Sequence, residues 1–139
     1  MRQEVLDRVG RLSPGTTPAW GKMSASQMLA HLVDWMEMAS GQLPTAPRRR
    51  LLRYPGVKHL VIYWLPFPKG VPTAPELVAR TPSDWSAECT ALSRHLESFV
   101  EMESGFAWPE HPAFGMLTPK AWGTLAYRHI DHHLRQFGV

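Results

Sequence analysis

Apolar residues recur at helical spacing in four stretches of the chain. Residues 2–12 repeat valine and leucine three or four positions apart, which predicts a short amphipathic helix. Residues 24–41, 81–105 and 118–137 continue the same spacing over longer distances, and Gly41 and Gly105 mark the ends of the second and third stretches. No stretch alternates apolar and polar residues with a period of two. The pattern therefore predicts an all-α fold, a four-helix bundle.

Capping residues stand at the start of the three longer helices. Ser24 followed by Gln27 fits the capping box, in which each side chain serves the backbone N–H of the other residue. The sequence Thr81-Pro82-Ser83-Asp84 supplies a cap, a proline for the first turn and an acid that favours the helix dipole. Thr118-Pro119 is expected to cap the last helix in the same way.

The segment between the second and third helices has a different character. Residues 41–82 hold eight of the thirteen prolines, and this content excludes a long helix. A short helix fits within residues 51–64. We expect a long Pro-rich crossover, which would allow two helices of one bundle to run parallel. Residues 1–139 are expected to form a single domain.

Composition places the chain among globular proteins. Its 139 residues are 44% hydrophobic and 19% charged, and the single cysteine excludes an intrachain disulfide and a cysteine-rich zinc site. Residues 1–20 show no apolar signal core, and the longest apolar run, residues 60–67, is far shorter than a membrane span. A cytoplasmic location without membrane association is expected.

The net charge of +3 is concentrated in one segment. Arg48, Arg49, Arg50 and Arg53 lie close together in the crossover, with Lys58 nearby. Nucleic-acid binding usually needs cations spread along a docking face, whereas a short basic run is usually a solvated surface. We therefore expect no nucleic-acid partner.

Three histidines are predicted to point inward. His129 and His133 are four residues apart, so they share one helix face, which also carries Trp122 and Leu125. His31 lies on the apolar stripe of the second helix. Buried imidazoles need partners, because an unsatisfied polar group costs roughly 1–3 kcal/mol. Three of them converging in a bundle core favour a divalent metal site with an open position over ordinary core histidines.

The remaining candidates are weaker. His132 is expected at the edge of its helix face, as a neighbour of the ligands or in solvent, and His111 in a turn or at the mouth of the site. His95 is expected at the periphery of the third helix. Cys89 is expected to face the core as a small apolar residue rather than to act as a nucleophile. Trp35 and Trp122 share faces with the histidines and are candidates for a pocket wall.

Several segments resemble the DinB/YfiT-like superfamily, in particular a short branch of it. The resemblance is carried by the ends of the chain: Trp20-Gly21-Lys22-Met23, residues 27–32, His111-Pro112-Ala113-Phe114-Gly115, Trp122 and residues 127–138. It implies a four-helix bundle of the up-down-down-up type with a divalent metal. The implied ligands are His31, His129 and His133, and Gln136 matches the glutamine that follows them.

The resemblance also implies a range of functions. Related members include metal-dependent hydrolases and thiol-dependent S-transferases or isomerases, and homodimers are frequent among them. We expect Zn²⁺ or Ni²⁺ in first place, then Fe²⁺ or Mn²⁺, and a small-molecule substrate or a low-molecular-weight thiol. No general acid or base is evident, because Asp131 points away from the ligand face and Asp34 reaches it only from the flank. The sequence therefore does not decide whether the protein is an enzyme. The alternative is a non-catalytic stress or interaction protein that the metal stabilises.

Overall fold

Helices make up the regular structure of the protein. The computed structural model describes the chain except residues 1, 49, 71–72 and 103–104. No β-strand occurs in this described part, apart from an isolated bridge between His111 and Gly115. The prediction of an all-helical chain is confirmed. The elements are α1 (Arg2–Val9), α2 (Ala25–Ala39), η1 (Arg50–Arg53), α3 (Pro55–Tyr63), η2 (Pro75–Leu77), α4 (Trp85–Glu101) and α5 (Pro119–Gln136).

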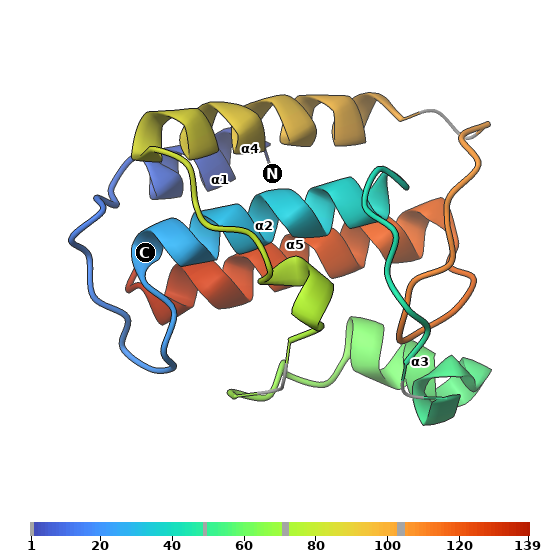
Figure 1. Cartoon of the computed structure of the whole chain (residues 1–139). Coiled ribbons are helices and arrows are strands. Elements are labelled where there is room, and N and C mark those ends of the chain that lie inside the picture. Colours follow the sequence, from blue (N-terminus) through green and yellow to red (C-terminus); the bar gives the residue numbers. More distant parts are fainter. Residues whose placement is uncertain (1, 49, 71–72, 103–104) are drawn as a thin grey trace.

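α1, α2, α4 and α5 all contribute side chains to one hydrophobic core. α2 packs most extensively against α4 and also lies against α5, while the short α1 contacts both α4 and α5 (Figure 1). α2 is buried on nearly all sides, which its mostly apolar sequence permits. The predicted inward positions are confirmed for Met28 and Leu32 on α2 and for Trp122 and Leu125 on α5, all of which are buried.

The helix starts follow from local chemistry. The capping box of Ser24 and Gln27 is present, and Thr118 accepts a hydrogen bond from the backbone N–H of Ala121. The predicted start at Thr81 is wrong: Asp84 is the N-cap of α4 and accepts from two backbone N–H groups, so Pro82 lies before the helix. α4 ends at Glu101, before Gly105, and residues 103–104 are not among those described.

The Pro-rich crossover contains more helix than the apolar pattern indicated. The short helix expected within residues 51–64 is present as η1 and α3, so the described chain has five α-helices. Only Ile62 of α3 is buried, and α3 lies at the edge of the molecule (Figure 1). Arg128 of α5 holds it there, because its guanidinium donates to the carbonyls of Val61, Ile62 and Leu65. Tertiary contacts rather than periodicity position this segment.

A helix that spans a lipid bilayer needs about 20 consecutive, mostly apolar residues. Among the described residues, no helix is long and apolar enough to span a membrane.

Candidate metal centre

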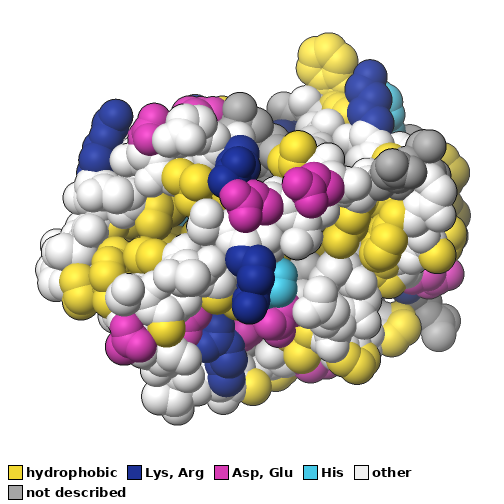
Figure 2. All heavy atoms as spheres, turned by 90° about the horizontal axis from the view of Figure 1, so that it is seen from above, with side chains coloured by type: hydrophobic (Ala, Val, Ile, Leu, Met, Phe, Trp, Pro, Cys, Tyr) yellow, Lys and Arg dark blue, Asp and Glu magenta, His cyan; other side chains and the backbone are white. Residues whose placement is uncertain are grey.

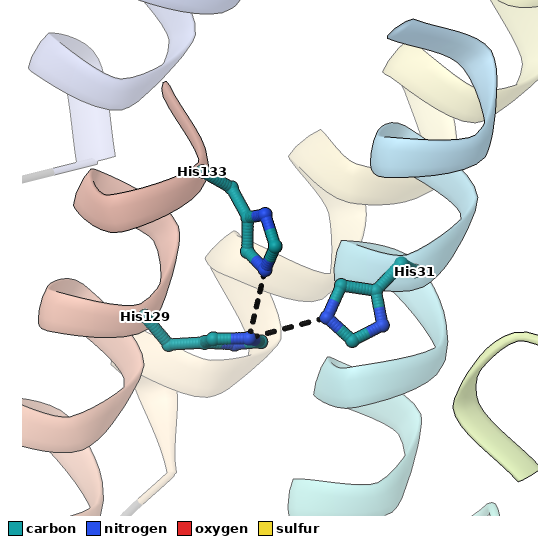
Figure 3. A group of neighbouring side chains, drawn as sticks. All are labelled: His31, His129 and His133. Atoms are coloured by element: carbon teal, nitrogen blue, oxygen red, sulfur yellow. Dashed lines mark hydrogen bonds between the residues drawn. The ribbon is translucent and has the colours of Figure 1, made fainter. Parts of the chain in front are cut away.

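Three imidazoles meet between α2 and α5. His31 extends from α2, and His129 and His133 extend from successive turns of α5 toward it (Figure 3). The Nε2 atom of His129 lies 3.2 Å from the Nε2 atoms of both other rings. One nitrogen from each ring lies within 4.8 Å of the others, a separation that allows them to share a metal ion. The predicted convergence of these three residues is therefore present.

The proton of His31 is fixed on the nitrogen that faces away from the cluster. Its Nδ1 atom lies 3.0 Å from the carbonyl oxygen of Leu77, which can only accept. Nδ1 must therefore carry the hydrogen, and the Nε2 atom of the neutral ring presents a lone pair to the cluster. Leu77 ends η2, so a segment of the crossover sets the tautomer of this ligand.

A glutamine fixes the proton of His133 in the same way. The side-chain amide of Gln136 donates from Nε2 to the carbonyl of Trp20 at 2.7 Å, which orients its oxygen toward His133. The Nδ1 atom of His133 donates to this oxygen at 2.9 Å. The Nε2 atom of His133 therefore also presents a lone pair, as in metal sites where an outer hydrogen bond orients a ligating histidine.

His129 cannot satisfy both neighbours with its single proton. Its Nδ1 atom is buried without a hydrogen-bond partner among the described residues. If its proton is on Nε2, it can be directed at only one of the two lone pairs; if it is on Nδ1, three lone pairs face one another. A cation would satisfy all three nitrogens at once, whereas a proton cannot. The donor set therefore fits a divalent metal that prefers imidazole.

Burial keeps these rings neutral. Desolvation lowers the pKa of His31, and it lowers the pKa of His133 to about 3. The pKa of His129 is held well below its usual value, first by desolvation and then by the neighbouring histidines. Metal ligation requires the neutral form of histidine, so the site is prepared for a cation at neutral pH.

A cavity of about 720 Å³ opens onto the three imidazoles. Its walls are mainly apolar and include Trp20, Trp35 and Phe67. The prediction for Trp35 is confirmed, and its ring lies 5.1 Å from that of His129. The prediction for Trp122 is wrong: it is fully buried behind Trp35, because α5 turns it toward the core instead of the cavity.

His132 and His111 both line this cavity but do not belong to the cluster. His132 lies at the edge of its helix face, as expected, with its ring 6.0 Å from those of Trp20 and Phe67. His111 is buried, and its Nδ1 atom accepts from the backbone N–H groups of Ala113 and Phe114. The predicted turn role of His111 is present, together with a position in the wall of the site.

Of two other predictions for helix α4, the one for His95 is wrong, and the one for Cys89 is confirmed in part. His95 is buried rather than peripheral, because its ring packs toward α2 with Nε2 3.5 Å from Glu37. Cys89 is only half-buried, although it packs against the core. Partial burial raises the pKa of its thiol, which argues against a nucleophilic thiolate.

The two aspartates near the ligands in sequence have other partners. Asp131 pairs with Arg8 and Arg135, away from the cavity. Asp34 is buried and pairs with Arg80, which also binds Glu88. Desolvation raises the pKa of Asp34, while the hydrogen bonds from Arg80 lower the pKa of Glu88. Nothing in the sequence singles out Arg80, since it belongs to no motif and one of its partners, Asp34, lies 46 positions earlier on α2.

The described cations of the arginine cluster make local contacts. Arg48 lies 3.4 Å from Glu76 and Arg53 lies 3.0 Å from Glu110, while Lys58 donates to the carbonyl of Met116. Arg49 and the side chain of Arg50 lie outside the described part of the structure. Ion pairs of this kind leave less free positive charge than the sequence suggests.

The fold and the site together define an all-helical protein with three histidine nitrogens gathered between two helices. The chain belongs to the family described as "Protein of unknown function (DUF1569)", whose model matches residues 2–138. Comparison with curated proteins and with solved structures gives no match.

Proposed function

We propose that this protein is a metal-dependent enzyme of the DinB/YfiT-like superfamily, with α1, α2, α4 and α5 as the four helices of the bundle. His31, His129 and His133 would hold the metal, Zn²⁺ or Ni²⁺ in first place. The observation that carries the proposal is the arrangement of protons. Hydrogen bonds at Nδ1 leave a lone pair on Nε2 of both His31 and His133, and both lone pairs face Nε2 of His129. The single proton of His129 cannot bond to both of them.

The cavity favours a catalytic site over a purely structural one. Structural metal sites are usually closed by protein ligands, whereas a catalytic site keeps a position for substrate. Here three protein ligands border a cavity of about 720 Å³, which lies within the size range of small-molecule sites. A divalent ion held there would supply Lewis acidity for the activation of water or of a thiol.

The residues around the cavity restrict the mechanism. None of its described lining residues is an aspartate or glutamate, so a carboxylate general base is not supported. His132 and His111 are the histidines outside the cluster that face the cavity, and Nδ1 of His111 is already engaged. Proton transfer would therefore depend on His132 or on the free nitrogen of His111.

Elemental analysis of protein purified without a nickel-affinity tag tests the metal site. We expect about one equivalent of a divalent metal in the wild type and a large loss in His31→Ala, His129→Ala and His133→Ala. His132→Ala is the matched control, because it removes an imidazole from the same cavity but not from the cluster. Unchanged metal content in the three ligand variants, with helicity retained by circular dichroism, would contradict the assignment.

Activity assays separate the reaction classes. Hydrolysis of esters or amides by the metal-loaded protein alone would indicate a hydrolase. Turnover only after addition of a low-molecular-weight thiol would indicate an S-transferase. A stably bound metal without turnover in either assay would favour the alternative, a non-catalytic stress or interaction protein that the metal stabilises.

We further propose that the protein forms a homodimer and has a small-molecule rather than a nucleic-acid partner. Exposed apolar side chains along η1 and α3 support the dimer. The local pairing of Arg48 and Arg53 supports the absence of a nucleic-acid partner.

A further inference from the structure

The charges around the cavity have one sign. Among its described lining residues, only Lys22 and Arg48 carry a formal charge, and both are cations. The guanidinium of Arg48 lies 3.4 Å from Glu76, which offsets its charge. Lys22 makes no ion pair with any residue that the structure describes. Lys22, an exposed residue, therefore adds a positive charge without an ion pair among the described residues to the lining of a mainly apolar cavity.

The main chain at Lys22 is held close to the histidine cluster. The backbone N–H of Ala19 donates to the carbonyl of Gln136 at 2.7 Å, and the amide of Gln136 donates to the carbonyl of Trp20. Gly21 has a φ of 81°, and a Cβ there would lie 2.5 Å from the amide nitrogen of Gln136. This close approach requires glycine, and it fixes the backbone of the loop beside the residue that orients His133.

The walls select a ligand with an apolar body. Trp20, Trp35, Phe67 and Phe114 contribute aromatic surface, and the cavity volume suits an organic molecule of moderate size. An anionic group beside Lys22 can accept a charge-assisted hydrogen bond from its ammonium, which is stronger than a hydrogen bond between neutral groups. A cationic ligand would be repelled by Lys22, and an uncharged one would gain no electrostatic attraction from it.

We propose that this cavity binds an amphiphilic organic anion, whose apolar body lies along the aromatic wall and whose anionic group is recognised by Lys22. The proposal rests on the proposed function only in treating the cavity as the substrate site. The charge and the walls of the cavity do not depend on a metal.

Isothermal titration calorimetry with three ten-carbon probes tests this inference. Decanoate, decanol and decyltrimethylammonium share one chain and differ in charge, and each is titrated into the 139-residue protein as purified and after chelator treatment. We expect decanoate to bind about tenfold more tightly than decanol, the usual scale of one charge-assisted hydrogen bond, and decyltrimethylammonium to bind most weakly.

Variants identify the recognising cation. Lys22→Met should weaken decanoate binding about tenfold and leave decanol binding unchanged, since only the ammonium is lost. Lys120→Met is the matched control, because it removes the same charge from an exposed position outside the cavity. Equal binding of decanoate and decanol, equal effects of the two variants, or no binding of any probe would overturn the proposal.

A separate Zn²⁺ titration distinguishes failure of this inference from failure of the proposed function. If Zn²⁺ does not bind but chelator-treated protein retains the decanoate preference and its dependence on Lys22, the anion site stands and the metal proposal fails. If Zn²⁺ binds at the histidines while decanoate shows no preference over decanol, the anion site fails alone.

Discussion

At the scale of single residues, Gln136 determines much of the candidate site. Its one side-chain amide accepts from His133 and donates to Trp20, so it orients a ligand and fixes a loop of the cavity at the same time. Because an amide has distinct donor and acceptor ends, only one orientation satisfies both partners. The position of the proton on His133 therefore depends on the backbone carbonyl of Trp20, more than a hundred residues earlier in the chain.

His111 supports a prediction about acid stability. Burial, with a further contribution from Arg53, lowers the pKa of His111 to about 3. Between this value and the ordinary pKa near 6.5, the unfolded chain binds a proton that the folded chain does not. Stability must therefore fall as the pH is lowered through this window. His111→Asn keeps an acceptor for the turn but cannot titrate.

Chemical denaturation at pH 7 and pH 5 measures the effect. From pH 7 to pH 5 the wild type should lose about 2 kcal/mol more unfolding free energy than His111→Asn. The other buried histidines titrate in both proteins, so their contributions cancel in the difference. Parallel losses in the two proteins would show that His111 is not held neutral by burial.

At the scale of elements, the segment from η2 to Arg80 connects the site to the bundle. The carbonyl of Leu77 accepts a hydrogen bond from Nδ1 of His31, and three residues later Arg80 binds Asp34 on α2 and Glu88 on α4. The guanidinium thus fastens the segment that sets a ligand tautomer. Both carboxylates are buried, so they depend on this one cation for their charge balance.

Replacement of Arg80 should therefore be costly. Arg80→Met leaves two buried carboxylates without a partner and should lower the unfolding free energy by about 2 kcal/mol. This is less than the 3–5 kcal/mol typical of fully buried pairs, because the Arg80 side chain is 35% exposed. Arg2→Met is the control, since its pair with Glu97 is exposed and should contribute at most about 1 kcal/mol. Urea denaturation compares them, and equal midpoints would exclude the proposed role.

The sequence predicted those parts of the fold that local chemistry determines. The capping box of Ser24, the cap at Thr118 and the inward face of α5 depend on residues within a few positions, so their patterns could be recognised. The convergence of His31 on the α5 pair followed from two such faces meeting in one core. Each of the two faces was recognised from the spacing of apolar residues within its own helix.

Long-range contacts could not be predicted in this way. Arg80 and Arg128 bind partners from 8 to 67 positions away, and nothing in their neighbours indicates it. Helical geometry predicted a peripheral His95, yet α2 covers it, because the direction from which a neighbour packs is a tertiary property. The roles of Leu77 and of Trp20 as carbonyl acceptors are invisible in sequence, since any residue type supplies a backbone oxygen.

At the scale of the whole molecule, charges of both signs are mixed over the face that Figure 2 shows, whereas exposed apolar side chains gather in patches. On the face above α4, basic and acidic side chains are interspersed, and hydrophobic side chains gather beside them (Figure 2). Interspersed charges of both signs give no single-sign field for a polyanion on this face. Apolar surface is therefore the more informative feature for a partner, and on η1 and α3 it includes Leu51, Tyr54, Leu60 and Trp64, each about half exposed or more.

This apolar surface predicts that the protein dimerises through η1 and α3. Trp64 is 74% exposed, and large aromatic side chains of this kind are frequent anchors of protein interfaces. A stable dimer buries about 800 Å² per partner, so residues next to these side chains would have to join the interface. We expect sedimentation equilibrium to show a concentration-dependent dimer in the wild type and a monomer in Trp64→Lys, since a desolvated ammonium would oppose association. Val100→Lys is the control and should remain dimeric, because it introduces the same charge at an exposed apolar position on α4. A monomeric wild type, or equal behaviour of the two variants, would contradict the prediction.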